Sequence, residues 1–334
     1  MTESADQPVV GVIGGGAWGT ALAVAASRAG SRALIWARDG EMVKAINDTH
    51  INSRYLPDIT LPDNIAATGD LAAVCKAEAV LLVVPAQHLA TTLDDAARHW
   101  IDGVPAVICA KGIERDTDRL MSAVARDQLG RRAPLAVLSG PTFAREVALG
   151  LPAAVTLAVE DRAIGDRLVE LLGSPTFRPY LTDDVIGAEI GGTVKNVLAI
   201  ACGIIEGKQL GDNARAALVT RGLAEMTRLC TALGGRAETM AGLSGLGDVT
   251  LTCNATQSRN FSFGVALGEG RSLADLLAEG TTVEGFHSSE AVSRMARNAG
   301  IDAPVCAAVD GILNSFADID ATISGLMNRP FREE

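Results

Sequence analysis

Aromatic side chains and basic charge are both scarce in this chain of 334 residues. Aromatic residues make up only 4% of the sequence, so few rings are available to stack against nucleic-acid bases. The chain has 29 Lys and Arg against 40 Asp and Glu, which gives a formal net charge of −11. This balance argues against a protein that binds the phosphate backbone of nucleic acids. An anionic ligand would therefore need a local cationic site.

Paired cysteines, a leader sequence and a long apolar run are also missing. None of the six cysteines lies within four residues of another, so the sequence predicts no metal site of the zinc type. Scattered cysteines in apolar stretches are typical of a reduced, intracellular protein. Residues 1–8 lack the basic start and apolar run of a signal peptide, and residues 197–205, the longest apolar run, are too few to cross a bilayer. We expect a cytoplasmic protein with no transmembrane segment and no nucleic-acid partner.

The first half of the chain alternates short, unbroken apolar runs with helix-like segments. Such runs are typical of strands that are buried on both faces of a parallel sheet. They predict an α/β fold, in which residues 1–184 form a doubly wound, mostly parallel, Rossmann-like sheet. The predicted strands are residues 9–13, 33–36, 79–84, 106–110, 135–138, 154–159 and 177–181.

After Asp183 and Asp184 the pattern changes to helical spacing, which predicts an all-α second domain over residues 185–334. The length of the chain agrees with about two domains. The predicted helices are residues 185–206, 214–233, 261–268, 273–278, 288–298 and 303–316.

A glycine motif follows the first predicted strand and opens a predicted helix over residues 18–29. Gly14, Gly16 and Gly19 have the G-x-G-x-x-G spacing of dinucleotide-binding sites. We expect Gly14 to permit a tight turn, Gly16 to let the backbone approach a pyrophosphate, and Gly19 to allow close packing of the helix on the strand. The alternative is a merely tight turn between strand and helix, which this context makes the weaker interpretation.

The end of the second predicted strand bears on the choice between NAD and NADP. An acidic residue there binds the ribose hydroxyl of NAD, whereas an arginine accommodates the extra phosphate of NADP. The chain has Ala37-Arg38-Asp39, with no acid at the strand end itself. Arg38 slightly favours NADP or tolerance of both cofactors, while Asp39 and an ordinary surface role for Arg38 keep the question open.

Polar residues follow several of the strands and are predicted to gather at one edge of the sheet. Lys111 follows one strand, and residues 139–142 (Ser-Gly-Pro-Thr) follow the next. Lys111 could equally be a solvated loop lysine, and residues 139–142 could be only a turn.

Lys195 and Asn196 lie inside an apolar helical segment, directly after Gly191-Gly192-Thr193-Val194. A buried lysine is costly unless it is paired or its pKa falls. It could reach solvent at the helix edge, or it could act as a general acid/base. The two glycines favour close approach of another backbone or a ligand, and we favour the catalytic interpretation.

Residues 258–260 (Ser-Arg-Asn) precede another predicted helix. Ser258 is a candidate N-cap, which places Arg259 and Asn260 in the first helical turn. A helix start that carries an arginine can bind phosphate or carboxylate, although capped surface helices with an exposed arginine are common.

Together these stretches closely resemble the bacterial NAD(P)-dependent glycerol-3-phosphate dehydrogenases. The resemblance covers residues 10 to about 316. It is carried by GGGAWGTALA (14–23), NSRYLP (52–57), VPAQ (84–87), AKGIE (110–114), LSGPTFAREV (138–147), GGTVKNVLAI (191–200), GLGDVTLT (245–252) and TQSRNFSFG (256–264).

The resemblance implies reversible hydride transfer between a nicotinamide cofactor and dihydroxyacetone phosphate, which gives sn-glycerol 3-phosphate for phospholipid synthesis. It implies that Lys195 is the acid/base and that the substrate lies near Lys111, Gly140, Thr142, Asp248, Ser258, Arg259 and Asn260. It places the cofactor near Ala17, Trp18, Arg38, Tyr55, Lys111, Ala144, Arg259, Thr282 and Glu284, beside the glycine motif. It also implies a homodimer, and the proposed site would lie in a cleft between the two domains.

Two other functions compete with this one. A 3-hydroxyacid or ketopantoate type of dehydrogenase would act on a carboxylate, whereas Arg259 and Lys111 suit a phosphate. A nucleotide-binding sensor or scaffold without turnover would gain stability from apolar residues in place of Lys195 and Asn196. The roles of Lys208, Arg215 and Arg221, the direction of flux and feedback control stay open.

Overall fold

The structure is a computed structural model that describes residues 7–280 and 282–330. The chain divides into two compact units, one drawn from residues 1–111 and 120–188 and the other from residues 112–119 and 189–334. No pattern in the sequence indicated that residues 112–119 group with the second unit. The domain boundary after residue 184 stays a prediction.

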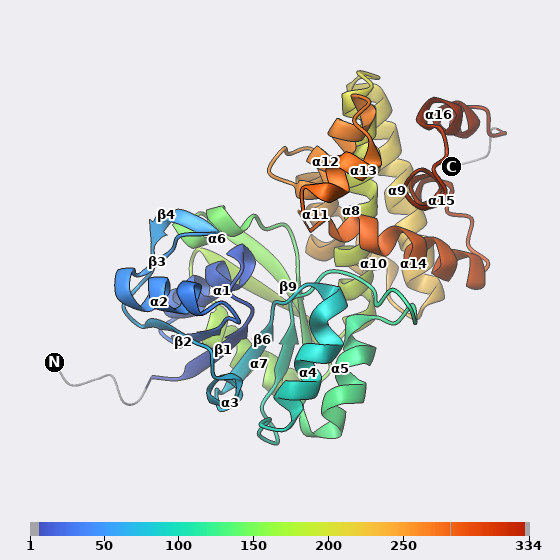
Figure 1. Cartoon of the computed structure of the whole chain (residues 1–334). Coiled ribbons are helices and arrows are strands. Elements are labelled where there is room, and N and C mark those ends of the chain that lie inside the picture. The colour runs from blue at the N-terminus through green and yellow to red at the C-terminus, as the bar shows by residue number, and fades with distance from the viewer. Residues whose placement is uncertain (1–6, 281, 331–334) are drawn as a thin grey trace. The chain divides into compact units, whose positions relative to one another are not determined.

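A sheet of eight strands forms the centre of the first unit (Figure 1). The strand order is β10-β9-β8-β7-β6-β1-β2-β5. All neighbouring strands are parallel except β8 and β9, so the prediction of a mostly parallel sheet is confirmed. The strands are β1 (Val9–Ile13), β2 (Arg32–Trp36), β5 (Ile65–Thr68), β6 (Ala79–Leu82), β7 (Ala106–Ile108), β8 (Leu135–Ser139), β9 (Ala153–Val159) and β10 (Phe177–Thr182).

Three of the strands in this unit were not predicted. The edge strand β5 is one of them, and the others pair as a small antiparallel hairpin, β3 (Ile51–Asn52) with β4 (Leu56–Thr60). The hairpin lies outside the main sheet, and its sequence has no continuous apolar run that would have revealed it.

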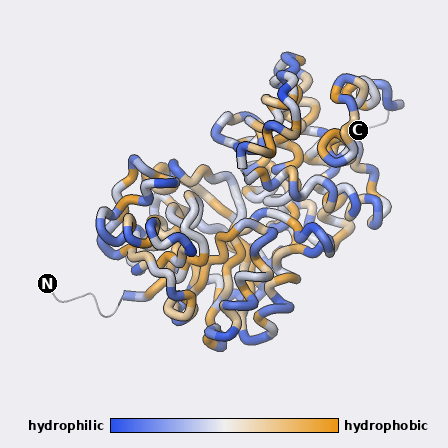
Figure 2. The backbone as a smooth tube through the Cα atoms, in the orientation of Figure 1, coloured by the Kyte–Doolittle hydropathy of each residue, from blue (hydrophilic) through white to orange (hydrophobic). Residues whose placement is uncertain are grey.

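Helices cover both faces of the sheet, which explains why the strands are apolar throughout. Val10 and Val12 of β1 pack into one cluster with α1, α6 and α7, whereas Val80 and Leu82 of β6 pack into another with α3, α4 and α5. Figure 2 shows the hydrophobic stretches that run through these strands. The helices of this unit are α1 (Ala17–Arg28), α2 (Gly40–Thr49), α3 (Leu71–Val74), α4 (Leu89–Ala97), α5 (Met121–Leu129), α6 (Ala144–Leu149) and α7 (Arg162–Leu172), with 3-10 turns η1 (Ala86–His88) and η2 (Gly130–Arg132).

The strand order reverses beside β1. The chain passes from β1 to β2 and β5 on one side, and then returns to β6 on the other side of β1. In open α/β sheets, ligands bind beyond the carboxyl ends of the strands at such a reversal. The glycine motif directly follows β1 and therefore lies at this point.

The described part of the second unit is helical and has no β-strand, in agreement with the predicted all-α domain. Its first helix, α8, is long and apolar enough to cross a membrane by length and composition, but its apolar stretch is entirely buried, as in the core helix of a soluble protein. The helices are α8 (Val185–Gly207), α9 (Asp212–Ala232), α10 (Ala237–Met240), the π-helical turn η3 (Leu243–Gly247), α11 (Asp248–Thr252), α12 (Arg259–Gly268), α13 (Leu273–Ala278), α14 (Glu284–Asn298), α15 (Pro304–Asn314) and α16 (Ile319–Met327).

Residues 112–119 are held within the second unit by Arg294 of α14. Its Nε donates to Asp118 Oδ2 at 2.5 Å, and its Nη2 donates to Asp118 Oδ1 at 2.6 Å and to the Arg115 carbonyl at 2.9 Å. Thr193 of α8 also donates to the Gly112 carbonyl at 3.3 Å. A forked guanidinium contact of this kind fixes both the position and the direction of the segment.

A buried carboxylate, Glu225 of α9, caps the N-terminus of α15. Its oxygens accept hydrogen bonds from the backbone N–H groups of Val305 at 2.8 Å and Cys306 at 3.1 Å. Burial raises the pKa of Glu225, and the two backbone N–H groups act in the opposite direction. Glu225 therefore supports the packing of α15 on α9.

Candidate functional site

The glycine-rich turn after β1 combines two crowded glycines with one open glycine. Gly14 has φ +132°, and a Cβ there would lie 2.9 Å from the Val83 carbonyl. A Cβ on Gly19 would lie 1.9 Å from the Gly14 oxygen, whereas a Cβ on Gly16 would meet nothing within 4 Å. The turn therefore needs Gly14 and Gly19 to fold, and it leaves open space at Gly16. This is the arrangement that the motif predicted.

The N-terminus of α1 faces that space with unused donors. Gly16 is the N-cap of this helix, which begins at Ala17. Glycine has no side chain that could accept hydrogen bonds from the first N–H groups of the helix. The Trp18 Nε1 atom is buried and has no hydrogen-bond partner. Free N–H groups at a helix start attract phosphate through hydrogen bonds and the helix dipole.

A buried asparagine, which was not among the predicted site residues, supports this turn. Asn52 of β3 donates from Nδ2 to the Gly15 carbonyl at 2.9 Å and to Thr20 Oγ1 at 2.7 Å. It also accepts a backbone hydrogen bond from Tyr55 at 3.2 Å. The hairpin is thus tied to the glycine-rich turn. The only signal in the sequence was an asparagine in the stretch NSRYLP.

Two of the residues expected around the cofactor, Arg38 and Tyr55, are exposed. Arg38 follows β2, and Tyr55 is 43% exposed in the turn of the hairpin. Asp39, the residue that kept the cofactor question open, is the N-cap of α2 and accepts from Glu41 N at 3.0 Å and Met42 N at 3.4 Å.

Polar groups gather where β7 and β8 end, as predicted. Lys111 Nζ donates to the Gly140 carbonyl at 3.0 Å, and Thr142 Oγ1 donates to the same oxygen at 3.3 Å. Gly140 has φ +150°, and Ala144 begins α6 two residues after Thr142. Ser139 Oγ is buried without a partner. Lys111 is therefore held by the turn at residues 139–142, and the solvated-loop interpretation of this lysine is wrong.

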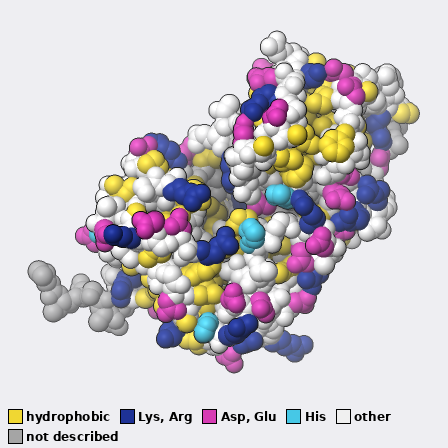
Figure 3. Space-filling view, in the orientation of Figure 1, with side chains coloured by type: hydrophobic (Ala, Val, Ile, Leu, Met, Phe, Trp, Pro, Cys, Tyr) yellow, Lys and Arg dark blue, Asp and Glu magenta, His cyan; other side chains and the backbone are white. Residues whose placement is uncertain are grey.

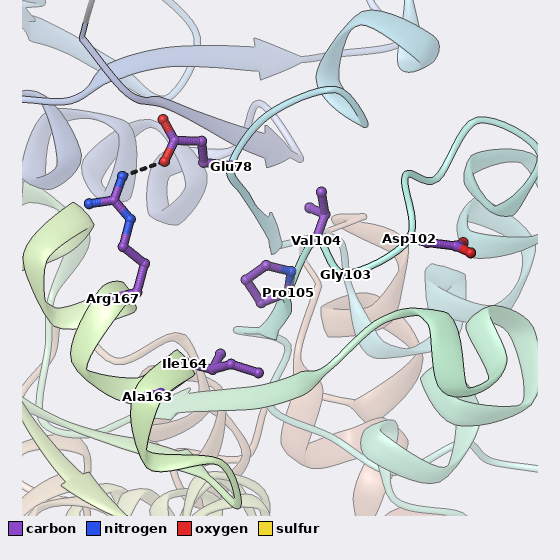
Figure 4. A pocket seen from close by; sticks show the side chains of 8 residues that line it. All are labelled: Glu78, Asp102, Gly103, Val104, Pro105, Ala163, Ile164 and Arg167. Carbon is purple, nitrogen blue, oxygen red and sulfur yellow. Dashed lines mark hydrogen bonds and ion pairs between the residues drawn. The ribbon is translucent and has the colours of Figure 1, made fainter.

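The hollow drawn in Figure 4 lies at the opposite ends of the strands. Its lining includes Glu78, which precedes β6, Pro105, which precedes β7, and Arg167 of α7, which pairs with Glu78. No predicted site residue lines it. We therefore place the candidate site at the carboxyl ends of the strands and not in this hollow.

In the second unit, Lys195 forms a buried polar cluster with two residues of α11. Its Nζ donates to Asp248 Oδ1 at 2.6 Å and to Thr252 Oγ1 at 2.9 Å, and Thr252 Oγ1 lies 3.2 Å from Asp248 Oδ1. The lysine side chain is 9% exposed and the aspartate 0%. The alternative that Lys195 reaches open solvent at the helix edge is wrong, because the lysine is paired inside the unit.

A glycine allows this cluster to form. A Cβ on Gly191 of α8 would lie 2.3 Å from the Ser244 carbonyl, in the π-helical turn that leads into α11. The backbone before Asp248 can approach α8 only because Gly191 has no side chain. The prediction of close backbone approach is confirmed at Gly191.

Asn196 belongs to a second set of contacts that joins α8, α12 and α14. Asn260 Nδ2 donates to Asn196 Oδ1 at 2.9 Å, and Asn260 Oδ1 accepts from the backbone of Gly285 at 2.9 Å. Glu284 is the first residue of α14, and Thr282 lies two residues before it. The structure thus brings together Asn196, Asn260 and the start of α14.

The start of α12 has the predicted cap. Ser258 Oγ accepts from the backbone N–H of Phe261 at 3.2 Å, and Arg259 is the first helical residue. Arg259 is exposed and has no carboxylate partner among the described residues. It is therefore available to an anionic ligand.

Two of the three cations left open by the sequence are held in ion pairs within the second unit. Lys208 pairs with Asp320 at 2.7 Å, and Arg215 pairs with both Glu206 and Asp212. Arg221 is exposed on α9. Lys208 and Arg215 are thus each held by carboxylates of the second unit.

The described residues contain no candidate metal centre, and one face of the molecule carries charges of both signs. No group of three or more His, Cys, Asp or Glu that could hold a metal ion occurs in residues 7–280 and 282–330. On the face drawn in Figure 3, acidic and basic side chains are interspersed. The charge of the chain therefore does not gather into one patch on that face.

Comparison with known proteins gives matches over most of the chain. Residues 9–164 match the N-terminal model of NAD-dependent glycerol-3-phosphate dehydrogenase, and residues 184–324 match the C-terminal one. Proteins named glycerol-3-phosphate dehydrogenase [NAD(P)+] from Rhodospirillum rubrum and Caulobacter vibrioides are 56% and 55% identical, over 97% of this chain and 93% and 98% of their own lengths. The crystal structure of glycerol-3-phosphate dehydrogenase from Coxiella burnetii is 38% identical, with a TM-score of 0.91 over 97% of this chain and 99% of that one.

Proposed function

The chain belongs to the NAD-dependent glycerol-3-phosphate dehydrogenase family, and on that premise we propose that Lys195 is its general acid/base. It is an NAD(P)-dependent oxidoreductase, and the reaction is the interconversion of dihydroxyacetone phosphate and sn-glycerol 3-phosphate. The observation that carries the proposal is the buried cluster of Lys195, Asp248 and Thr252.

The first unit binds the cofactor in this proposal. The open space at Gly16, the donors at the start of α1 and the unpartnered Trp18 Nε1 fit the pyrophosphate of a dinucleotide. Arg38 and Tyr55 serve its adenosine end, and Lys111 and Ala144 contact it further along the carboxyl edge of the sheet. When bound, the nicotinamide supplies the hydride.

Lys195 supplies the proton. As hydride adds to carbon 2 of the ketone, the carbonyl oxygen gains negative charge, and the lysine ammonium stabilises it and transfers a proton to it. In the reverse direction the neutral amine accepts the proton of the hydroxyl group. Asp248 and Thr252 accept hydrogen bonds from Nζ at 2.6 and 2.9 Å and fix its position.

The phosphate of the substrate is bound by Arg259 and the start of α12. The exposed guanidinium and the N–H groups beside Ser258 suit a dianion, and Asn260 is oriented by Asn196. Lys111, Gly140 and Thr142 are the substrate residues that we assign to the first unit. Thr282 and Glu284 contact the cofactor.

We also propose that the enzyme is a cytoplasmic homodimer that makes glycerol phosphate for phospholipid synthesis and slightly prefers NADP(H). All six cysteines are free and buried, which suits a reducing compartment. The exposed Arg38 beyond β2 supports the preference for NADP(H).

A steady-state assay of the purified chain tests the reaction. We expect oxidation of NADPH and NADH with dihydroxyacetone phosphate, and none with small 2-keto or 3-keto acids at the same concentration. Turnover with a keto acid alone would reassign the substrate to a carboxylate. Cofactor binding without turnover of either substrate class would indicate a binding protein.

A further inference from the structure

We propose that Arg54 is a specificity-determining residue that holds the 2′-phosphate of NADP(H), an assignment that rests on the proposed function. Arg54 lies in the turn between β3 and β4. Its Nη1 is 3.6 Å from Asp39 Oδ2, and its guanidinium carbon is 5.4 Å from the centre of the Tyr55 ring. It therefore lies between the segment that follows β2 and a residue assigned to the cofactor.

The backbone that carries Arg54 is anchored to the glycine-rich turn. Asn52, two residues earlier, is buried and donates to the Gly15 carbonyl at 2.9 Å and to Thr20 of α1 at 2.7 Å. Asn52 also accepts the Tyr55 N–H. These hydrogen bonds hold the hairpin backbone against the glycine-rich turn, and they thereby set the position from which the Arg54 side chain extends.

Asp39 is not in the state that NAD selection requires. In NAD-selective sites, an acid beyond the second strand accepts a hydrogen bond from the ribose 2′-hydroxyl. Here Asp39 Oδ1 caps α2, and Oδ2 faces Arg54. The Arg54 cation also offsets the charge of Asp39, which would otherwise repel a 2′-phosphate.

Arg54 can change partner when the 2′-phosphate arrives. The Arg54 and Asp39 side chains are 67% and 43% exposed, and an ion pair with such exposure is weak. A phosphate dianion offers a guanidinium more charge than a carboxylate does, and it accepts forked hydrogen bonds. Arg38, exposed and adjacent to Asp39 in the chain, supplies a second cation.

Calorimetric titration of the full-length protein with 2′,5′-ADP and with 5′-AMP tests the assignment, because these ligands differ only in the 2′-phosphate. We expect Arg54→Ala to lower the affinity for 2′,5′-ADP about tenfold and the affinity for 5′-AMP less than about twofold. Arg54→Lys should retain part of the difference in affinity between 2′,5′-ADP and 5′-AMP. Arg98→Ala is the matched control, since Arg98 pairs with Asp94 at 3.7 Å with 70% and 68% exposure, and it should change neither affinity.

Three results would overturn the assignment. In the first, Arg54→Ala loses affinity equally for both ligands. In the second, the ratio of the two affinities is the same in Arg54→Ala as in Arg98→Ala. In the third, the wild-type protein binds both ligands with the same affinity. Failure of the proposed function gives a different pattern. If no dihydroxyacetone phosphate is reduced but Arg54→Ala still selectively loses 2′,5′-ADP, the role of Arg54 is supported and the proposed reaction is wrong.

Discussion

Replacing Lys195 by methionine should separate its role in stability from its role in chemistry. The substitution leaves the Asp248 carboxylate, which is 0% exposed, with Thr252 as its remaining side-chain partner in the cluster. Breaking a buried ion pair in this way costs roughly 3–5 kcal/mol. Loss of a general acid lowers kcat by about 10²–10⁴-fold.

The double variant Lys195→Met with Asp248→Asn should recover most of the stability and none of the activity. It removes both charges, and neutral replacement of a buried pair is often close to neutral in stability. Thermal unfolding should show a Tm lower by about 6–20 °C in the single variant, and a much smaller change in the double variant. Turnover of dihydroxyacetone phosphate, measured well below either Tm, should be lost in both.

Lys208→Met is the control for this experiment. Lys208 pairs with Asp320 at 2.7 Å, but that aspartate side chain is 71% exposed. The substitution should therefore lower the free energy of unfolding by about 1 kcal/mol or less and leave turnover unchanged. Turnover within tenfold of wild type in Lys195→Met would remove the lysine from the mechanism. A double variant as unstable as the single one would refute the argument from the buried pair.

Three further predictions follow from local contacts. Gly19→Ala should destabilise the protein by about 1–3 kcal/mol in a melting curve, because its Cβ would lie 1.9 Å from the Gly14 oxygen. Gly16→Ala should fold normally, because a Cβ there meets nothing within 4 Å, and a titration should show that it binds NADPH at least about tenfold more weakly. The raised pKa of Glu225 means that the folded protein keeps this proton at a pH where the unfolded chain has lost it, so Glu225 lowers stability as pH rises from about 4.3 toward the higher folded pKa. Unfolding measured from acid to neutral pH should therefore show wild type losing stability relative to Glu225→Gln. Burial raises the pKa of Cys75 to about 11, so a thiol reagent at mildly alkaline pH should leave it unmodified until denaturant is added.

Each of these has a contrary outcome. Normal NADPH affinity in Gly16→Ala would mean that the open space does not receive the pyrophosphate. Parallel stability curves for wild type and Glu225→Gln would mean that this carboxyl does not titrate differently on folding. Fast modification of Cys75 in the native protein would mean that the first unit opens readily.

The sequence predicted the strands that are buried on both faces better than those at the margin. Val80 and Leu82 point to one face and Leu81 to the other, so an unbroken apolar run was the expected signal. The edge strand β5 and the strands β3 and β4 are only two to five residues long and partly exposed, so none of them has a long apolar run. The antiparallel step between β8 and β9 depends on how the chain returns after α6, which periodicity does not specify.

The candidate site also has features that could be predicted from the sequence and others that could not. The N-cap at Ser258 and the role of Gly19 depend on neighbours close in sequence, and they could be predicted. Gly14 could be predicted from the motif spacing, but the Val83 backbone that crowds it could not. The partner of Lys195 could not, because Asp248 lies 53 residues further along the chain and is brought to α8 by close backbone packing at Gly191. Apolar surroundings indicated that Lys195 needed a partner, but they did not say which residue it was.

The eight residues that follow Lys111 have a consequence for how the protein is made. They emerge from the ribosome early, yet the guanidinium that binds Asp118 belongs to a residue 176 positions later. Until that arginine has been synthesised, the polypeptide beyond β7 lacks its forked contact, however complete the sheet around it is. No single cut in the gene can release either unit whole, because the backbone passes from one to the other three times.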